Sequence, residues 1–188
     1  KSTKRALVVA DLPFGSYEKS PEQGLETALR FMKEAGAHAV KLEGAQIETV
    51  KKLVSSGIPV MGHLGLTPQS LHQLGGYRVQ GRENPELIIE QAKNLENAGV
   101  FAIVLELIPA DLAEKIQKSL QIPVIGIGAG PNCDAQVLVW TDLVGLTANS
   151  PKFSRKYLNL RAEIATAAKN WSKDVKSGEF PNLNETFS

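Results

Sequence analysis

Residues 100–130 read VFAIVLELIPADLAEKIQKSLQIPVIGIGAG, and this stretch decides the fold class. It contains a short apolar run, an amphipathic segment and a second apolar run that ends in glycines. The pattern predicts a strand, a helix and a strand, and strands joined in this way are parallel with a right-handed crossover. Only Glu106 interrupts the first apolar run. A strand of this kind is normally covered on both faces, where an unpaired carboxylate is costly.

The same unit recurs along the chain. One predicted helix, for example, begins with Ser20 as its N-cap and Pro21 at its first position, and stops at Gly36. The tail from 151 to 179 predicts one or two further helices. No linker divides the sequence, so we expect one domain over residues 1–188, with 151–188 as its C-terminal helical segment. Strands are predicted at 6–14, 38–44, 58–66, 100–109 and 122–130, and a last apolar run follows at 143–147.

Two α/β architectures fit this alternation, an open doubly wound sheet and a (β/α)₈ TIM barrel. Polar residues follow the carboxyl ends of nearly all the predicted strands: Asp11, Lys41 and Glu43, His63, and Glu106. Barrel enzymes build their sites from many strand ends, whereas an open sheet uses mainly its switch point, so the barrel is favoured. About six strands are recognisable, and a full barrel needs eight. We therefore expect about the first two βα units to be absent from this chain.

Composition excludes some classes of function. Lys and Arg number 21 against 20 Asp and Glu, a net charge of +1, which favours neither nucleic acid nor a membrane as partner. The apolar runs are too short to span a bilayer, and the opening KSTKR does not continue as a secretory signal. The single cysteine, Cys133, excludes an internal disulfide and suits a reducing compartment. We expect a cytoplasmic protein.

Lys41 and Glu43 lie two positions apart and therefore share one face of their strand. Because Val40 and Leu42 then point to the helices, the two charged side chains must point inward, and a functional role is the preferred interpretation. For Asp11, capping of the next turn is equally plausible, since Asp often plays that part near proline. His63 is the most ambiguous, because a histidine after a strand is often a buried structural residue.

Together these side chains predict a reaction type. Burial disfavours the charged form of Glu106, which makes it a stronger proton acceptor and a candidate general base. Asp11 and Glu43 offer oxygen ligands to a hard cation such as Mg²⁺, and Lys41 offers a positive charge. This set suits proton removal beside a carbonyl, giving an Mg²⁺-stabilised enolate that attacks an aldehyde or one-carbon unit. VIGIGAG is not a dinucleotide motif, and Cys133 has no basic neighbour, so we give neither a role.

Seven motifs, which occur in the same order as in one known family, cover nearly the whole chain: VVADLPFGSY, AVKLEG, VMGHLGLTPQS, GGYRVQGR, LELIP, IPVIGIGAG and PKFSRKY. They resemble the ketopantoate (3-methyl-2-oxobutanoate) hydroxymethyltransferases. The resemblance implies a TIM barrel of the phosphoenolpyruvate/pyruvate type and a homo-oligomer, commonly a decamer in bacteria. It implies transfer of a hydroxymethyl group from the folate co-substrate 5,10-methylenetetrahydrofolate to 3-methyl-2-oxobutanoate, which gives 2-dehydropantoate in pantothenate biosynthesis.

The resemblance also implies roles for individual residues. Asp11 matches a direct Mg²⁺ ligand that also contacts substrate, and Glu43 matches a glutamate that reaches the metal through water. Lys41 and His63 match residues that contact the keto acid, and Glu106 matches the base that removes the C3 proton.

The sequence departs from the family at its front. The family has an N-terminal portion, with a second metal-binding aspartate and a substrate-binding serine, that precedes the matching residues. Ala135 and Trp140 also differ from the usual glycine and polar residue. We expect the 188 residues to belong to a longer enzyme, with little or no activity alone. The alternatives are an impaired or scaffold barrel, or another metal-dependent lyase or aldolase of the superfamily.

Overall fold

The computed structural model describes residues 3–187. Its residues form two compact units, Lys1–Val137 and Leu138–Ser188. The first unit contains the sheet and the predicted site residues, and the second contains helices and turns. The expectation of a single domain over 1–188 stays a prediction.

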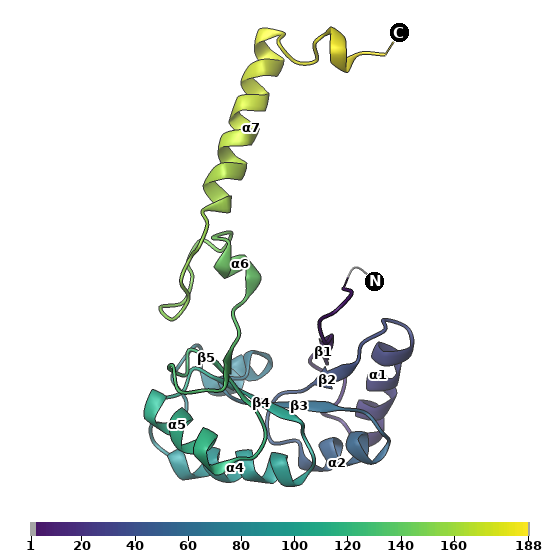
Figure 1. Ribbon diagram of the computed structural model, residues 1–188, viewed down its shortest axis with the longest axis vertical. Helices are drawn as coiled ribbons and strands as arrows, with labels where there is room; N and C mark the ends of the chain where they lie inside the picture. The colour runs from purple at the N-terminus through teal and green to yellow at the C-terminus, as the bar shows by residue number, and fades with distance from the viewer. Residues whose placement is uncertain (1–2, 188) are drawn as a thin grey trace. The chain divides into compact units, whose positions relative to one another are not determined.

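The first unit is built on a six-stranded parallel sheet in the order β1-β2-β3-β4-β5-β6 (Figure 1). Each strand therefore pairs only with its neighbours in sequence, and the described order contains no reversal. A doubly wound sheet reverses its order at the switch point, so the sequential order identifies six strands of a barrel. The strands are β1 Val9–Asp11, β2 Ala39–Lys41, β3 Val60–Gly65, β4 Ala102–Glu106, β5 Val124–Ile127 and β6 Ala135–Gln136.

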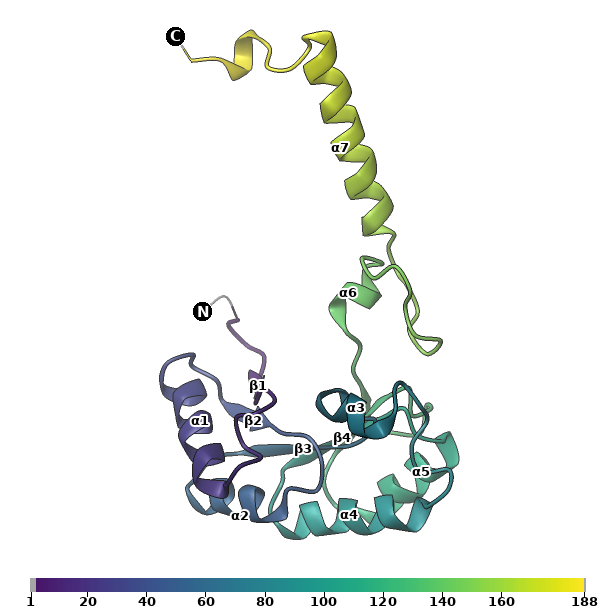
Figure 2. The same cartoon turned by 180° about the vertical axis from the view of Figure 1, so that it is seen from behind.

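The helices of the first unit support the same conclusion. Figures 1 and 2 show α1, α2, α4 and α5 following one another along one side of the sheet, as the outer ring of a barrel does. Consecutive members of this series pack against each other. The connection after β3 contains the only short helices of this unit's described part, η1 and α3. The bounds are α1 Pro21–Lys33, α2 Ile47–Ser55, η1 Pro68–Ser70, α3 Leu71–Leu74, α4 Pro85–Asn97 and α5 Ala110–Ser119.

Local sequence accounts for these elements. The Ser20 side chain accepts a hydrogen bond from the backbone N–H of Gln23, which confirms the predicted N-cap of α1. Val40 and Leu42 are fully buried in the core between sheet and helices, so their neighbours Lys41 and Glu43 point to the other face, as predicted.

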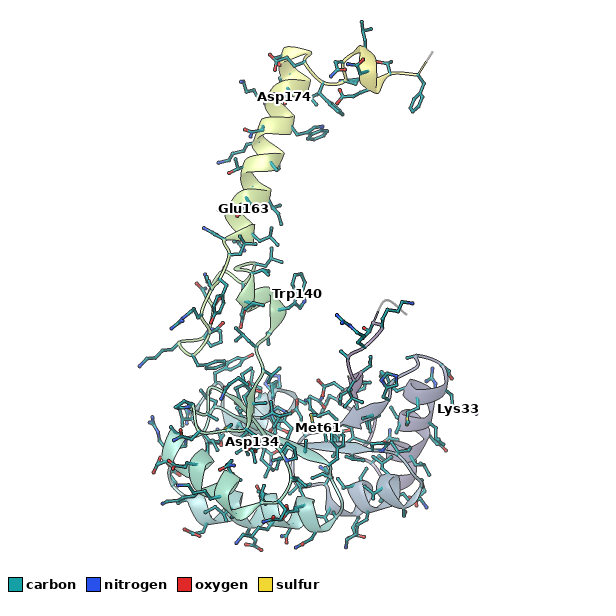
Figure 3. All side chains as sticks on the ribbon, viewed as in Figure 1. Lys33, Met61, Asp134, Trp140, Glu163 and Asp174 are labelled. Atoms are coloured by element: carbon teal, nitrogen blue, oxygen red, sulfur yellow. The ribbon has the colours of Figure 1, made fainter. Side chains whose placement is uncertain are left out.

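The second unit contains α6 Trp140–Leu143, α7 Leu160–Ser177 and η2 Leu183–Glu185. The apolar run 143–147 is not a strand. The backbone N–H groups of Leu146 and Thr147 both donate to the carbonyl of Thr141, which closes a turn after α6. Figure 3 shows the Trp140 side chain projecting from α6, where it is 62% exposed. No helix within residues 3–187 is long and apolar enough to cross a membrane.

Candidate active site

All five predicted site residues lie in, end or closely follow neighbouring strands of the sheet. Asp11, Lys41 and Glu106 are the last residues of β1, β2 and β4, and His63 lies in β3. Glu43 comes two residues after β2. Because the strands are parallel, their carboxyl ends meet at one edge, and this edge is where barrel enzymes carry their sites.

Lys41 links the first strand to the third. Its Nζ lies 2.5 Å from Oδ1 of Asp11 and 3.3 Å from Nδ1 of His63. The Lys41 side chain is 16% exposed, whereas that of Asp11 is 58% exposed. Lys41 is thus a largely buried cation with an anion on its solvent side, and the ion pair stabilises its charge.

His63 contacts both glutamates. Its Nδ1 lies 3.9 Å from Oε1 of Glu43, and its Nε2 lies 3.2 Å from Oε2 of Glu106. The second pair is close but poorly aligned, so the buried Nε2 has no hydrogen-bond partner among the described residues. A buried polar atom without a partner requires an explanation, and a polar atom of a bound substrate is one that fits here.

The contacts also assign the proton of neutral His63. A charged lysine offers only donors, so Nδ1 must accept from Lys41 and the ring proton resides on Nε2. Nε2 therefore carries the N–H group and lies on the side of the ring that faces Glu106. His63 is a hydrogen-bond donor to whatever binds beside Glu106.

Burial is the main influence on Glu43, which is 7% exposed, and it raises the pKa of this carboxyl above its ordinary value. The Gln69 backbone N–H, His63 and Lys41 oppose this increase in pKa, whereas the negative charge of Asp11 adds to it. The negative charge of Asp11 thus disfavours the ionised form of Glu43. A cation held by both carboxylates would offset this repulsion.

This pair of carboxylates fits a Mg²⁺ ion that keeps most of its water. Mg²⁺ is commonly held by one or two carboxylates, with water and substrate oxygens completing the octahedron. Within residues 3–187 no group of three or more His, Cys, Asp or Glu side chains is arranged as a metal site. The donors present suit a hard, partly hydrated cation and would not form a closed cage.

The backbone around Glu106 is held on several sides. Its carbonyl accepts from the N–H of Leu66 at 2.8 Å. The N–H of the next residue, Leu107, donates to the carbonyl of Ile127, and its carbonyl accepts from the N–H of Gln80, both at 2.9 Å. Leu107 has φ 48°, a positive value that no other non-glycine residue of the described chain adopts. Such strain persists where surrounding structure over-determines it, often beside a functional residue.

Sequence reasoning missed two residues that contact Glu43. The Tyr17 hydroxyl accepts from the Glu43 backbone N–H at 3.2 Å, and the Gln69 backbone N–H donates to Oε2 of Glu43 at 2.9 Å. Both lie inside motifs named above. Tyr17 and Gln69 are 52 positions apart in the sequence, so no local pattern connects the two residues.

Comparison with known proteins identifies the family. The family model for ketopantoate hydroxymethyltransferase matches residues 1–183. The chain belongs to this family. A 3-methyl-2-oxobutanoate hydroxymethyltransferase of Thermobifida fusca is 55% identical over all of the chain and 69% of its own length. The enzyme of the same name from Saccharopolyspora erythraea is 54% identical over 100% of the chain. The one from Gloeobacter violaceus is 58% identical over 94% of the chain. The chain spans 65% and 70% of these two relatives.

Solved structures agree on the fold. A structure of phosphonopyruvate hydrolase aligns with 96% of this chain, and the alignment covers 64% of the hydrolase chain, with 12% sequence identity and a TM-score of 0.50. A structure from Burkholderia cenocepacia matches 93% of this chain and 72% of its own, with 14% identity and a TM-score of 0.50. The chain therefore has the predicted fold, part of a TIM barrel.

Proposed function

We propose that this protein transfers a hydroxymethyl group from 5,10-methylenetetrahydrofolate to 3-methyl-2-oxobutanoate, giving 2-dehydropantoate. The proposal rests on the continuous series of contacts from Asp11 through Lys41 and His63 to Glu106, on four adjacent strands. The names of the homologues supply the substrates. The reaction consumes one water and releases tetrahydrofolate.

Glu106 is the proposed base that removes the proton from C3 of the keto acid. Its side chain is 14% exposed, and no described residue donates a hydrogen bond to its carboxylate, which leaves lone pairs free for a proton. The strained, hydrogen-bonded backbone of Leu107 fixes the direction of the preceding side chain. A base that is already fixed in place loses less entropy when the transition state forms.

Lys41 and His63 stabilise the negative charge that this step creates. When the C3–H bond breaks, the electron pair spreads toward the C2 carbonyl oxygen. The buried ammonium of Lys41 and the Nε2–H of His63 are the donors available on the adjacent strands. Water displaces both folate nitrogens from the methylene carbon, which releases tetrahydrofolate and formaldehyde. The nucleophilic C3 then adds to the formaldehyde carbon, and the alkoxide that forms takes up the proton held by Glu106.

Asp11 and Glu43 are the proposed ligands of Mg²⁺, with Glu43 acting through water. Bound there, the ion would supply positive charge beside the keto-acid oxygens. Asp11 also holds Lys41 by its ion pair, so one carboxylate orients the lysine while facing the metal.

Exchange of the C3 proton tests Glu106 without the folate. The protein is incubated with 3-methyl-2-oxobutanoate and Mg²⁺ in D₂O, and loss of the C3 proton signal is followed by NMR. Glu106→Gln is expected to slow exchange by about 10²- to 10⁴-fold, the usual contribution of a general base. Glu90→Gln, an exposed glutamate of α4, is the matched control.

Equal exchange by wild type and Glu106→Gln would remove Glu106 from the mechanism. A folded, metal-loaded wild type that exchanges no deuterium would contradict the enolate step itself. Product formation is then measured with methylenetetrahydrofolate added, because exchange alone does not report the one-carbon transfer.

We also propose that the protein is a homo-oligomer, as in the family it belongs to. The second unit exposes large apolar side chains that a monomer would leave in water, including Trp140, Ile164 and Trp171. Sedimentation velocity is expected to give a mass that is a multiple of the subunit mass. A single 20.3 kDa species from these 188 residues would contradict the proposal.

An impaired or scaffold barrel is the second candidate. It is favoured by the described metal donors, which number fewer than three at the site. The two candidates differ in the exchange experiment, since a scaffold binds the keto acid without labelling C3. The series of pairwise contacts that links all five predicted side chains favours the enzyme.

A further inference from the structure

Tyr17 and Gln69 form a hydrogen-bonded clamp behind Glu43. The Tyr17 side chain is 2% exposed, and its hydroxyl donates to Oε1 of Gln69 at 2.9 Å while it accepts from the Glu43 N–H at 3.2 Å. A phenol in the core needs such partners, and here both its donor and an acceptor position are used. The Tyr17–Gln69 clamp is thus hydrogen-bonded directly to the backbone of Glu43.

Gln69 reaches three other segments at once. Its Oε1 accepts from Tyr17, its Nε2 donates to the carbonyl of Leu12 at 2.9 Å, and its backbone N–H donates to Oε2 of Glu43 at 2.9 Å. Leu12 directly follows Asp11, and its own N–H donates to the carbonyl of Lys41 at 2.9 Å. The Gln69 side chain therefore ties together the chain after β1 and the loop after β3, while its backbone holds the carboxylate after β2.

Close packing keeps the clamp in place. Gly24 of α1 lies against Tyr17, where an added Cβ would be 3.4 Å from the tyrosine Cβ and 2.6 Å from Thr49. Leu12, a member of the same core cluster as Tyr17, is fully buried. Tyr17 has little space to turn away, so its hydroxyl remains directed at Gln69 and Glu43.

We infer that Tyr17 and Gln69 are positioning residues that fix the separation of the Asp11 and Glu43 carboxylates for a divalent cation. Neither touches the substrate in this scheme. They act through Leu12 and Glu43, and the inference rests on the proposed function because it takes these carboxylates as the metal site. Partners of this kind behind metal ligands typically change metal affinity by about 10- to 100-fold when removed.

Mn²⁺, whose binding is measured directly by electron paramagnetic resonance, is the probe. Tyr17→Phe removes only the hydroxyl and keeps the ring in the core. Gln69→Met keeps the length of the side chain and removes both amide groups. Each variant is expected to bind Mn²⁺ about 10- to 100-fold more weakly in the purified full-length protein. If Gln69→Met fails to fold, Tyr17→Phe still tests the inference.

Matched controls come from the same connection after β3. Tyr77→Phe and Gln73→Leu change exposed residues that form no side-chain hydrogen bond within the described chain. They are expected to keep the wild-type Mn²⁺ affinity within about twofold. A second measurement separates positioning from mere loss of structure: saturating Mn²⁺ should restore most of the C3 exchange rate in Tyr17→Phe.

The outcomes distinguish this inference from the proposed function. Wild-type Mn²⁺ affinity in both Tyr17→Phe and Gln69→Met overturns the clamp while the proposed reaction stands. An exchange defect that saturating Mn²⁺ does not restore also overturns it. A wild type that exchanges deuterium but binds no Mn²⁺ removes the metal and the clamp together, and one that does neither overturns the proposed function as well.

Discussion

His63 shows how one side chain gains its role from neighbours on other strands. In the sequence it is a histidine near the end of an apolar run, flanked by glycines, and a buried structural role fits equally well. In the fold it is 3% exposed and lies between Lys41 on one side and Glu106 on the other. Because its Nδ1 must accept from the lysine, its Nε2–H is left to meet a substrate.

Cys133 is the residue at which pH dependence can be measured away from the proposed metal ligands. Burial raises the pKa of its thiol above the ordinary value, and the negative charge of Asp134 adds to the increase. At a given pH the folded protein then holds less thiolate than the unfolded chain. Alkylation by iodoacetamide at pH 8 is expected to be several-fold slower in the native protein than in urea.

The native rate should rise with pH until it passes the raised pKa of Cys133. Cys133→Ser verifies that the label is on this residue, the sole cysteine of the chain. Equal alkylation rates of native and unfolded protein at pH 8 would show that the thiol is neither buried nor shifted. A mass spectrum of the labelled protein reads out both rates.

At the scale of elements, the joint between β3 and β4 holds the proposed base in place. Gly65 pairs with Glu106 across the two strands and has φ 91°. A Cβ at this position would lie 2.1 Å from the Glu106 carbonyl oxygen, which accepts from the Leu66 N–H. Glycine is required here both by the backbone conformation and by the close approach of the neighbouring strand.

Gly65→Ala is therefore expected to lower the free energy of unfolding by about 3 kcal/mol, from backbone strain together with overpacking. Urea unfolding measures the change. Gly57→Ala is the matched control, because Gly57 has φ 82° with no heavy atom within 4 Å of an added Cβ. It should cost only the conformational part, about 1 kcal/mol. Equal losses in the two variants would show that contact with β4 is unimportant.

The elements themselves could largely be predicted from sequence. Five strands and the helix capped by Ser20 were expected near their observed places, since apolar periodicity and capping are local signals. The sixth strand, Ala135–Gln136, was not expected. It is two residues long and exposed, so it has no apolar pattern to detect. The apolar run 143–147 instead ends in a turn closed by hydrogen bonds to the carbonyl of Thr141, and its apolar composition does not distinguish such a turn from a strand.

At the scale of the whole molecule, the sequential order of the strands identifies the barrel type. The first unit has a continuous core beneath the helices, whereas α7 in the second unit buries none of its residues. A helix without buried contacts opens at low cost, because its stability depends on tertiary packing.

Limited proteolysis tests whether residues 1–188 behave as one domain. Trypsin is expected to cut first in α7, at sites such as Arg161, Lys169 and Lys173, and to leave a resistant fragment that contains the sheet. Electrophoresis and mass spectrometry identify the fragment. If α7 resists as long as the first unit, the chain behaves as one domain, or the helix is covered in the oligomer.

By itself, the sequence determined the α/β class, the family and the candidate residues, because strand alternation, caps and motifs are written in near neighbours. Tertiary structure alone decided which of these residues meet. His63 and Glu106 lie 3.2 Å apart on paired strands, and the Tyr17 hydroxyl meets Gln69 across 52 positions of sequence. Such contacts depend on the register of parallel strands and the packing of the loops at their carboxyl ends, and neither leaves a periodic signal along the chain.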